Sequence, residues 1–507
     1  MGLSGLDLVS FLGFLAMVVA VSLYASRKEE SAEDYFLAGR GLRWWLIGIS
    51  LVASNISTEH FVGMAGKGYE LGLAIASFEW IAVIALVVVA LVLLPRFLRA
   101  GIYTLPEYLE YRYNAAARAV MAFYLMVMYV VAAMAGVLYT GSLALGSLFG
   151  VDLYVGVWAI GVLAGAYTIY GGLKAVVWSD LIQGIALLAG GLLVMLLGFA
   201  AVGGPGVFFA ENADRLHMVL PADHPTMPWT IFLLGIWIPN LAYWGLNQFI
   251  TQRALAARDL AEGQRGILFA AALKLTIPFL VVFPGIMAFQ LYGDEVGTPD
   301  QAFPFLMNRL VPAGLRGMMF AALFGAVMSS LDSMLNSAST IFTKDLYERH
   351  WARERPSQRR LVAVGRLATG SFVVFACLLA PELRHMGAIY DYMQQAWNFI
   401  WPGVLAAFLW GIALPRVPST AAVAGLLAGV PLYALFNLGL GTAYLNAAAL
   451  SFVVTSALML SITWWRPLEE PRVLPDAAAV PLESAPEARA AGLALIGVTI
   501  ALYLVFW

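Results

Sequence analysis

Long apolar runs recur along almost the whole chain and limit its possible folds more than any other feature. Each is about 18 residues or longer, enough for an α-helix to cross the hydrocarbon core of a bilayer. With 61% hydrophobic and 12% charged residues, the 507-residue chain is too apolar for a soluble protein. We therefore predict an all-α, polytopic membrane protein of about fourteen transmembrane helices, near residues 6–25, 43–66, 72–95, 119–149, 153–171, 176–202, 229–250, 265–291, 313–343, 361–380, 387–412, 417–437, 445–465 and 490–506.

The first run and the lone cysteine exclude several classes of protein. Residues 6–25 follow no basic stretch and precede no small-residue cleavage site, so we read them as a retained span and not a signal peptide. A single cysteine, Cys377, excludes an intrachain disulfide and a cysteine-cluster metal site. The net charge of −2 provides no general attraction to nucleic acid, so no nucleic-acid partner is expected.

The distribution of basic residues indicates an orientation. With the amino terminus outside, most of the 29 Lys and Arg residues fall in cytoplasmic connectors, most densely at 344–366. This predicts a multi-pass protein of the cell membrane with both termini outside, and the short loops favour a bacterial inner membrane. Single tryptophans near span ends, such as Trp44, Trp229 and Trp401, are read as interfacial anchors.

Polar residues interrupt two of the apolar runs, at 52–60 and 238–248. In transporters, discontinuous helices at corresponding positions of two halves mark the substrate site. These two lie five helices apart, an odd number, which predicts an inverted repeat of five plus five helices with a LeuT-like core. We expect an extra N-terminal helix and cytoplasmic loop in 1–42, the transport core in 43–412 and three further helices in 413–507. The outer connectors 203–228 and 292–312 are long enough for short surface helices, and the Pro-rich segment 467–486 reads as a linker.

A stripe of hydroxyl-bearing residues lies at hydrocarbon depth in the run near 313–343, where polar atoms are costly and usually functional. At about 100° per residue it gathers small and hydroxyl side chains within a band roughly 100° wide. Asp332 and Asn336 lie along one edge of the band. Such hard oxygen ligands suit an alkali cation, and the band itself comprises Ala326, Ser329, Ser330, Ser333, Ser337 and Thr340.

Four motifs, in order and at matching spacing, carry a resemblance to a known family. They are the segments 53–64, 170–180, 244–253 and 317–347, the last with the sequence Met-Ser-Ser-Leu-Asp-Ser-Met-Leu-Asn-Ser. Together they resemble the sodium:solute symporter family, and more closely its sodium/sugar cotransporter branch, over nearly the whole chain. The resemblance implies a ten-helix inverted repeat that rocks between outward and inward states around a central site.

The resemblance implies sodium as the coupling ion and cofactor. Its shared site would use the carbonyls of Ala53, Ile56 and Ala326 with the hydroxyls of Ser329 and Ser330. In some relatives a second cation lies where this chain has Asp180, Asp332 and Ser333. The alternatives stay open: serines that bond their own helix turn, an Asp180 that caps a helix or pairs with an arginine, and an Asp332 that takes a proton or bonds Asn336.

Two single charges in apolar runs, Glu79 and Lys274, point to the solute site, because each is costly in a membrane unless satisfied. A polyol needs convergent donors and acceptors with an aromatic platform, and the candidates are Asn55, His60, Glu79, Asn240, Lys274 and Gln394. In the sugar branch these positions resemble sugar ligands. There Tyr243 resembles the inner gate, Asn247 would hold its hydroxyl, and the cavity lining comprises Trp244, Phe78, Met64 and Tyr390. The alternative is a structural Glu79–Lys274 ion pair with the amides holding helices together.

We therefore expect a sodium-coupled symporter that imports a hexose such as glucose or galactose, or else an inositol or other small polyol. Its partners would be the sugar, the sodium ion and the lipid bilayer, while the oligomeric state stays open. Bacterial members of the sugar branch tend to have Gln in place of His60, and Ala82 lacks a hydroxyl that some carry. Enzyme motifs are absent from the sequence, and an Asp180–Asp332 protease pair would need both groups near the bilayer centre. Two broken helices at an enclosed centre disfavour a channel.

Overall fold

The computed structural model describes residues 4–26, 31–352, 354, 356–385 and 389–507, and the side chains of 147–149 and 389–391 are outside that description. Within it the protein is all-helical, with isolated bridges in place of strands. The helices of the first half are α1 (Gly5–Ala25), α2 (Ala32–Leu37), α3 (Trp44–Asn55), α4 (Ala65–Leu71), α5 (Ser77–Val88), α6 (Leu94–Ala100), α7 (Leu105–Arg112), α8 (Ala115–Val127), α9 (Ala135–Phe149), α10 (Leu153–Ala201) and α11 (Pro205–Glu211). Those of the second half are α12 (Trp237–Leu246), α13 (Gln248–Leu255), α14 (Leu260–Tyr292), α15 (Ala302–Leu310), α16 (Leu315–Ile341), α17 (Gln358–Leu379), α18 (Ile389–Asn398), α19 (Trp401–Ala413), α20 (Ser419–Ala434), α21 (Tyr444–Trp465) and α22 (Ala488–Val505).

Eleven helical stretches in the described residues are long and apolar enough to cross a membrane. This confirms an all-helical, polytopic membrane protein. The stretches are fewer than the fourteen apolar runs because helical turns continue from one run into the next. Residues 59–100 form one such stretch through the π-helical turns η2 (Glu59–Met64) and η4 (Val89–Leu93), and α10 unites two runs. The interrupted runs yield helices too short to count, among them α3.

Both predicted helix breaks are confirmed. The first follows α3, where Ile56 adopts an extended conformation with ψ 107° before helical turns resume at Glu59. The second separates α12 from α13, where Asn247 is extended with ψ 119°. Each break frees the last carbonyls of the helix before it from the i→i−4 ladder. The breaks face each other, because the Asn55 side chain donates a hydrogen bond to the Tyr243 hydroxyl at 3.2 Å.

Glycines allow the closest helix contacts around these breaks. Gly172 turns α10 at φ 49°, and a Cβ there would come within 2.3 Å of the Tyr35 carbonyl oxygen. In α14, a Cβ on Gly285 would lie 2.0 Å from the carbonyl oxygen of Ala65, so α14 packs backbone to backbone against α4. Small residues of this kind are how helices in lipid approach closely.

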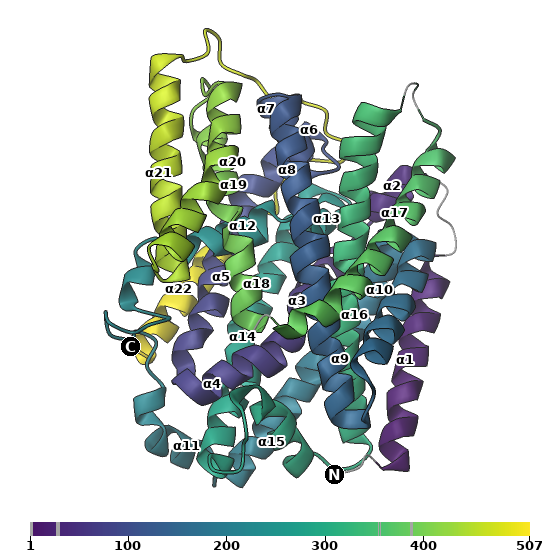
Figure 1. The fold of residues 1–507 in the computed structure, drawn as a ribbon, viewed down its shortest axis with the longest axis vertical. Helices are drawn as coiled ribbons and strands as arrows, with labels where there is room; N and C mark the ends of the chain where they lie inside the picture. Colours follow the sequence, from purple (N-terminus) through teal and green to yellow (C-terminus); the bar gives the residue numbers. More distant parts are fainter. Residues whose placement is uncertain (1–3, 27–30, 353, 355, 386–388) are drawn as a thin grey trace.

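The polar stripe lies on the most enclosed helix of the bundle. Nearly every residue of α16 from Met319 onward is buried, and α10, α1 and α17 pack around it. Figure 1 shows α1 at the outer edge of the bundle beside α16 and α10. The stripe therefore faces protein and not lipid, as intramembrane polar groups require.

The two long connectors, 203–228 and 292–312, and the linker 467–486 lie at opposite ends of the molecule. The two long connectors carry the expected short helices, α11 and α15. Residues near both chain ends contact this region: Met218 of the first connector donates to the Phe506 carbonyl at 2.8 Å, and Gly314, just before α16, donates to the Asp7 carboxylate at 2.8 Å. The linker 467–486 is non-helical, as expected, and passes over the other end of the bundle, at the top of Figure 1.

Candidate functional site

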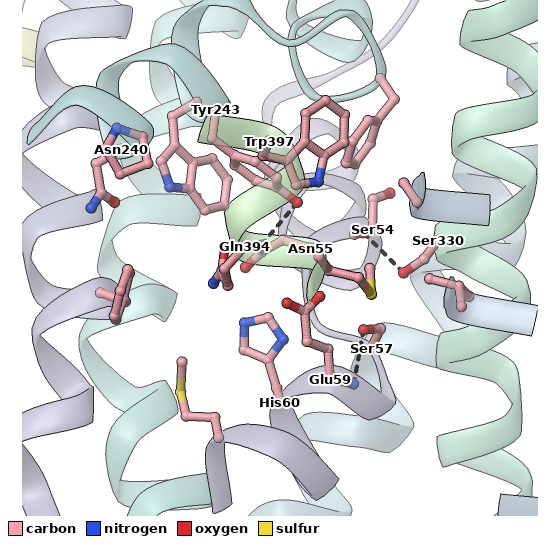
Figure 2. Close-up of a pocket in the computed structure, with 18 of the residues that line it drawn as sticks. Ser54, Asn55, Ser57, Glu59, His60, Asn240, Tyr243, Ser330, Gln394 and Trp397 are labelled. Atoms are coloured by element: carbon pink, nitrogen blue, oxygen red, sulfur yellow. Dashed lines mark hydrogen bonds between the residues drawn. The ribbon is translucent and has the colours of Figure 1, made fainter. Parts of the chain in front are cut away.

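A cavity of about 100 Å³ lies where the two helix breaks meet. In Figure 2, Tyr243 and Trp397 lie above it, Glu59 and His60 below it, and Gln394 and Asn55 between them. All eight residues expected at the solute site line this one cavity although they come from five helices and the π-helical turn η2. They are Asn55, His60, Glu79, Asn240, Tyr243, Trp244, Lys274 and Gln394.

The two intramembrane charges meet at the edge of this cavity. Lys274 on α14 forms a buried ion pair with Glu79 on α5. The Lys274 ammonium also donates to the Asn55 side-chain carbonyl and lies 4.9 Å from the centre of the Trp244 ring. In this conformation the charges thus satisfy each other, which is the alternative that the sequence left open.

A histidine extends this polar cluster and leaves a free hydrogen-bonding atom. The Nε2 atom of His60 lies 3.3 Å from the Glu79 carboxylate, while its Nδ1 atom is buried without a hydrogen-bond partner in the described residues. A buried polar atom without a partner costs about 1–3 kcal/mol. A solute hydroxyl in the cavity is one group that can satisfy it.

Aromatic rings close the cavity on the side away from His60. The Tyr243 ring packs edge-on against Trp244 at 5.4 Å and Phe249 at 5.7 Å. The expected contact from Asn247 to Tyr243 is wrong: Asn247 accepts a hydrogen bond from the Tyr129 hydroxyl, because the extended break directs its side chain toward the π-helical turn η5 (Met128–Met134). Met64 and Phe78 also line the cavity, and the Tyr390 side chain lies outside the described residues.

Two stacked tryptophans and a glutamate are among the lining residues that the sequence interpretation missed. Trp401 was expected to be an interfacial anchor, but it is buried and stacks on Trp397 with ring centres 5.0 Å apart. Nothing in the apolar run distinguished these rings from membrane anchors. Glu59 also lines the cavity, and its signal was visible as a carboxylate within the first helix break.

The five expected sodium ligands lie on two adjoining elements, the end of α3 and the middle of α16: Ala53, Ile56, Ala326, Ser329 and Ser330. The two elements touch where the Ser330 hydroxyl donates to the Ser54 carbonyl at 3.1 Å. The Ser329 hydroxyl donates instead to the Asp180 carboxylate at 2.5 Å. The hydroxyl of Ser330 thus adjoins the helix break, whereas that of Ser329 faces a second polar cluster, which surrounds Asp180.

The cluster around Asp180 also contains Arg253, which the sequence analysis did not single out as a site residue. Asp180 accepts hydrogen bonds from the hydroxyls of Ser50 and Ser54 and forms an ion pair with Arg253 on α13 at 2.9 Å. Arg253 also donates to the hydroxyls of Ser50 and Ser333. Its guanidinium, at the end of the 244–253 motif, therefore occupies the space beside Asp180.

The contacts of the two aspartates in this conformation bear on the alternatives that the sequence left open. Asp180 lies inside α10 and caps no helix; it pairs with an arginine. Asp332 accepts a hydrogen bond from the Tyr167 hydroxyl, not from Asn336, whose side-chain atoms have no hydrogen-bond partner in the described residues. Ser333 lies 3.5 Å from Asp332 and 3.1 Å from the Ser54 hydroxyl.

Comparison with known proteins agrees with this architecture. A model of the sodium:solute symporter family matches residues 35–429. The chain is 40% identical over 466 residues to a sodium/glucose cotransporter of Vibrio parahaemolyticus, covering 86% of this chain and 85% of that one. It is 34% identical over 464 residues to the sodium/myo-inositol cotransporter 2 of Mus musculus, covering 84% and 68%.

Solved structures show the same fold. A Na+-coupled sialic acid symporter in a substrate-bound outward-open state superposes with a TM-score of 0.84 at 23% identity, over 92% of this chain and 99% of that one. A nucleobase-cation-symport-1 family transporter gives 0.57 at 13% identity, over 91% and 99%. These likenesses concern the LeuT-like fold. In this family sodium is a cotransported substrate and not a cofactor. From the family match over most of its length, the chain belongs to the sodium:solute symporter family, as a sodium-coupled solute symporter of the membrane and not an enzyme.

Proposed function

We propose that the protein imports a neutral, polyhydroxylated solute together with sodium, and that this solute is a hexose such as glucose or galactose. The observation that carries the proposal is the convergence of Glu79, Lys274, Asn55 and His60 on one cavity with aromatic walls. These groups offer donors and acceptors to hydroxyls, and the rings suit the apolar face of a pyranose.

Two further observations reduce the number of candidate solutes. The lining residues that the structure describes include no arginine, the side chain that would bind the carboxylate of a sialic acid bidentately. Two relatives are, by their names, a sodium/glucose cotransporter and a sodium/myo-inositol cotransporter. An inositol is therefore the second candidate, and small amino acids are disfavoured.

The transport core would be a five-plus-five inverted repeat within fourteen membrane passes, spanning 43–412 and flanked by 1–42 and 413–507. Support comes from the two breaks, one per half, and from Gly172, which divides α10 into two passes. The contacts of Phe506 with Met218 and of Asp7 with Gly314 support a location of both termini on one side, which we assign to the outside of a bacterial inner membrane by the basic-residue asymmetry.

We assign the sodium ion to the junction of α3 and α16, where Ala53, Ile56 and Ala326 would supply carbonyls and Ser329 and Ser330 hydroxyls. The Ser330–Ser54 contact supports the junction. Ser329 would have to leave Asp180 to reach the ion. Tyr243 would act as the inner gate, held by Asn55 and not by Asn247.

The second cation expected at Asp180, Asp332 and Ser333 would compete with Arg253 for the same oxygens. We propose that the guanidinium replaces this cation in the present conformation, so that one sodium accompanies each solute. One sodium crossing about 100 mV releases about 2.3 kcal/mol, and a tenfold gradient adds about 1.4 kcal/mol. Together these allow roughly 500-fold accumulation, and a second coupled sodium would square that ratio.

The test is uptake of labelled glucose, galactose, myo-inositol and proline into proteoliposomes, with sodium or choline outside. We expect saturable, sodium-dependent hexose uptake that Lys274→Ala and Glu79→Ala each abolish, because each leaves one buried charge unpaired beside the solute. The control is Lys67→Ala, which breaks an ion pair with Glu70, does not alter a residue that lines the cavity and should leave uptake unchanged.

Two results would contradict the proposal in different ways. Proline or inositol uptake without hexose uptake would refute the choice of solute while leaving sodium coupling in place. Unchanged hexose kinetics in Lys274→Ala, with the protein inserted at the wild-type level, would refute the cavity as the solute site.

A further inference from the structure

A second cavity, of about 270 Å³, lies away from the solute site and is lined by four arginines. Arg96 and Arg99 come from α6 and Arg112 from α7, while Arg472 comes from the linker that crosses this end of the bundle. Figure 1 shows α6 and α7 at the top of the molecule, at the end opposite the N-terminus. Four cations thus converge on one cavity although they are separated by up to 376 positions in the chain, from 96 to 472.

The charge of this cluster is not balanced by acidic side chains. Of the ion pairs in the part of the chain that the structure describes, none involves any of the four arginines. By contrast, Arg118, at the start of the next helix, pairs with both Glu110 and Asp345. Carboxylates thus pair with the nearby Arg118, whereas the described residues that line this cavity include no Asp or Glu.

Arg112 forms the buried floor of the cavity, with only 2% of its surface exposed. It donates to the carbonyls of Gly411, Leu414 and Val417, at 2.7, 2.7 and 3.2 Å, at the end of α19. Burial lowers the pKa of Arg112, and the charge of Arg472 lowers it further. Carbonyl dipoles orient this guanidinium, but a full negative charge would stabilise it more.

The linker holds Arg472 over the cavity. Its backbone nitrogen donates to the Pro415 carbonyl at 3.0 Å, and its guanidinium donates to the Tyr111 carbonyl at 3.2 Å. An excess of Lys and Arg in the cytoplasmic loops is enough to orient a membrane protein, and these residues need not converge on one pocket. Orientation alone therefore does not account for the arrangement.

Apolar surface adjoins the arginines on the membrane side. Val92, one turn before Arg96, is 37% exposed, and Leu409, one turn before the end of α19, is 43% exposed. Ile412 and Leu474 line the cavity itself. A ligand with a phosphate at the arginines and an acyl chain along Val92 and Leu409 would contact both kinds of surface.

We propose that this cavity binds the phosphate group of an anionic phospholipid from the cytoplasmic leaflet. Arg96, Arg99 and Arg472 would contact the phosphate oxygens, and Arg112 would contribute its buried charge beneath them. Basic pockets between helices on the cytoplasmic side suit anionic headgroups, and each arginine near the surface contributes about 1 kcal/mol, a factor of roughly five in affinity. The proposal depends on the membrane orientation but not on the identity of the transported solute.

The test is native mass spectrometry of the full-length protein titrated with phosphatidylglycerol or phosphatidylcholine. We expect the wild type to prefer phosphatidylglycerol by about tenfold or more, and the triple variant R96Q/R99Q/R472Q to lose that preference. Arg112 is retained because it holds the end of α19. The matched control, R359Q/R466Q/R489Q, removes three exposed arginines that do not line this cavity and should keep the preference.

Three results would overturn the proposal. The triple variant could retain the preference, or the control could lose it equally, which would indicate a general basic attraction. Alternatively, inorganic phosphate in excess could displace the lipid from the wild type, identifying a soluble phosphate as the occupant. An unchanged unfolding midpoint of the triple variant in phosphatidylcholine would exclude misfolding as the cause of a lost preference.

Discussion

The ion pair between Arg253 and Asp180 makes a quantitative prediction about sodium. Both side chains are buried, with 1% and 0% of their surface exposed, and they approach to 2.9 Å. In Arg253→Met the carboxylate of Asp180 keeps its serine donors but loses its counter-charge. Removing one partner of a buried pair costs about 3–5 kcal/mol, because the other charge stays buried and unpaired. We expect a loss of stability of this size in choline chloride.

Sodium should restore part of this loss. With the guanidinium removed, the oxygens of Asp180, Ser333 and Ser54 are available to a cation. An ion that binds only the folded state stabilises it by about 2.7 kcal/mol when its concentration is 100 times its dissociation constant. That amounts to about half or more of the expected loss.

The assay is the thermal unfolding midpoint in detergent, in sodium chloride and in choline chloride at equal ionic strength. The wild type would also respond to sodium through the proposed shared site, so the quantity compared is the sodium-induced gain of each protein. Arg253→Met should gain more than the wild type, and its Hill coefficient for sodium should rise. The double variant Arg253→Met/Asp180→Asn, which has no carboxylate to satisfy, should show no extra gain. Equal gains in Arg253→Met and the wild type would refute the idea that the guanidinium takes the place of a cation.

Two further predictions concern the sodium site and the helix contacts. Ser330→Ala should raise the sodium concentration for half-maximal uptake by about tenfold, because one hydrogen-bonding oxygen is lost. Ser371→Ala, which alters an exposed serine bonded to its own helix, should not change it. If both variants showed the same sodium dependence of uptake, the proposed sodium site would be wrong. Gly285→Ala should lower stability by about 1–3 kcal/mol, because its Cβ would meet the Ala65 carbonyl. Gly13→Ala, with open space around it, is the control for unfolding midpoints, and equal midpoints for both variants would contradict the close packing of α14 on α4.

Polar residues in apolar runs were enough to predict both helix breaks. A stretch such as 52–60 cannot remain a lipid-facing helix at low cost, so its polar groups must face protein or a cavity. The same argument applies singly to Glu79 and Lys274, and both line one cavity with Asn55 and His60. Asn240 lies within the second interrupted run, 238–248, whereas the resemblance to a family added Gln394.

The pairing of side chains could not be predicted in the same way. Arg253 lies just after an interrupted run, where arginine is ordinary, and its burial depends on how α13 packs against α3 and α16. Trp401 near a span end has the same sequence signature whether it meets lipid or a cavity. Its position is decided by the turn between α18 and α19, which stacks it on Trp397. Such contacts depend on the register of helices far apart in sequence, which no local pattern encodes.

Two consecutive residues at the end of α3 connect the cation region to the solute region. The Ser54 carbonyl accepts from Ser330 and its hydroxyl contacts Asp180, whereas the Asn55 side chain contacts Lys274 and Tyr243. Side chains one position apart on a helix point about 100° apart, so one rigid helix end faces both regions. In the proposed site, an ion bound by Ala53 and Ile56 would fix this helix end against α16 and thereby also fix the position of Asn55 in the cavity. Sodium can therefore favour solute binding without touching the solute, because both depend on the same break in α3.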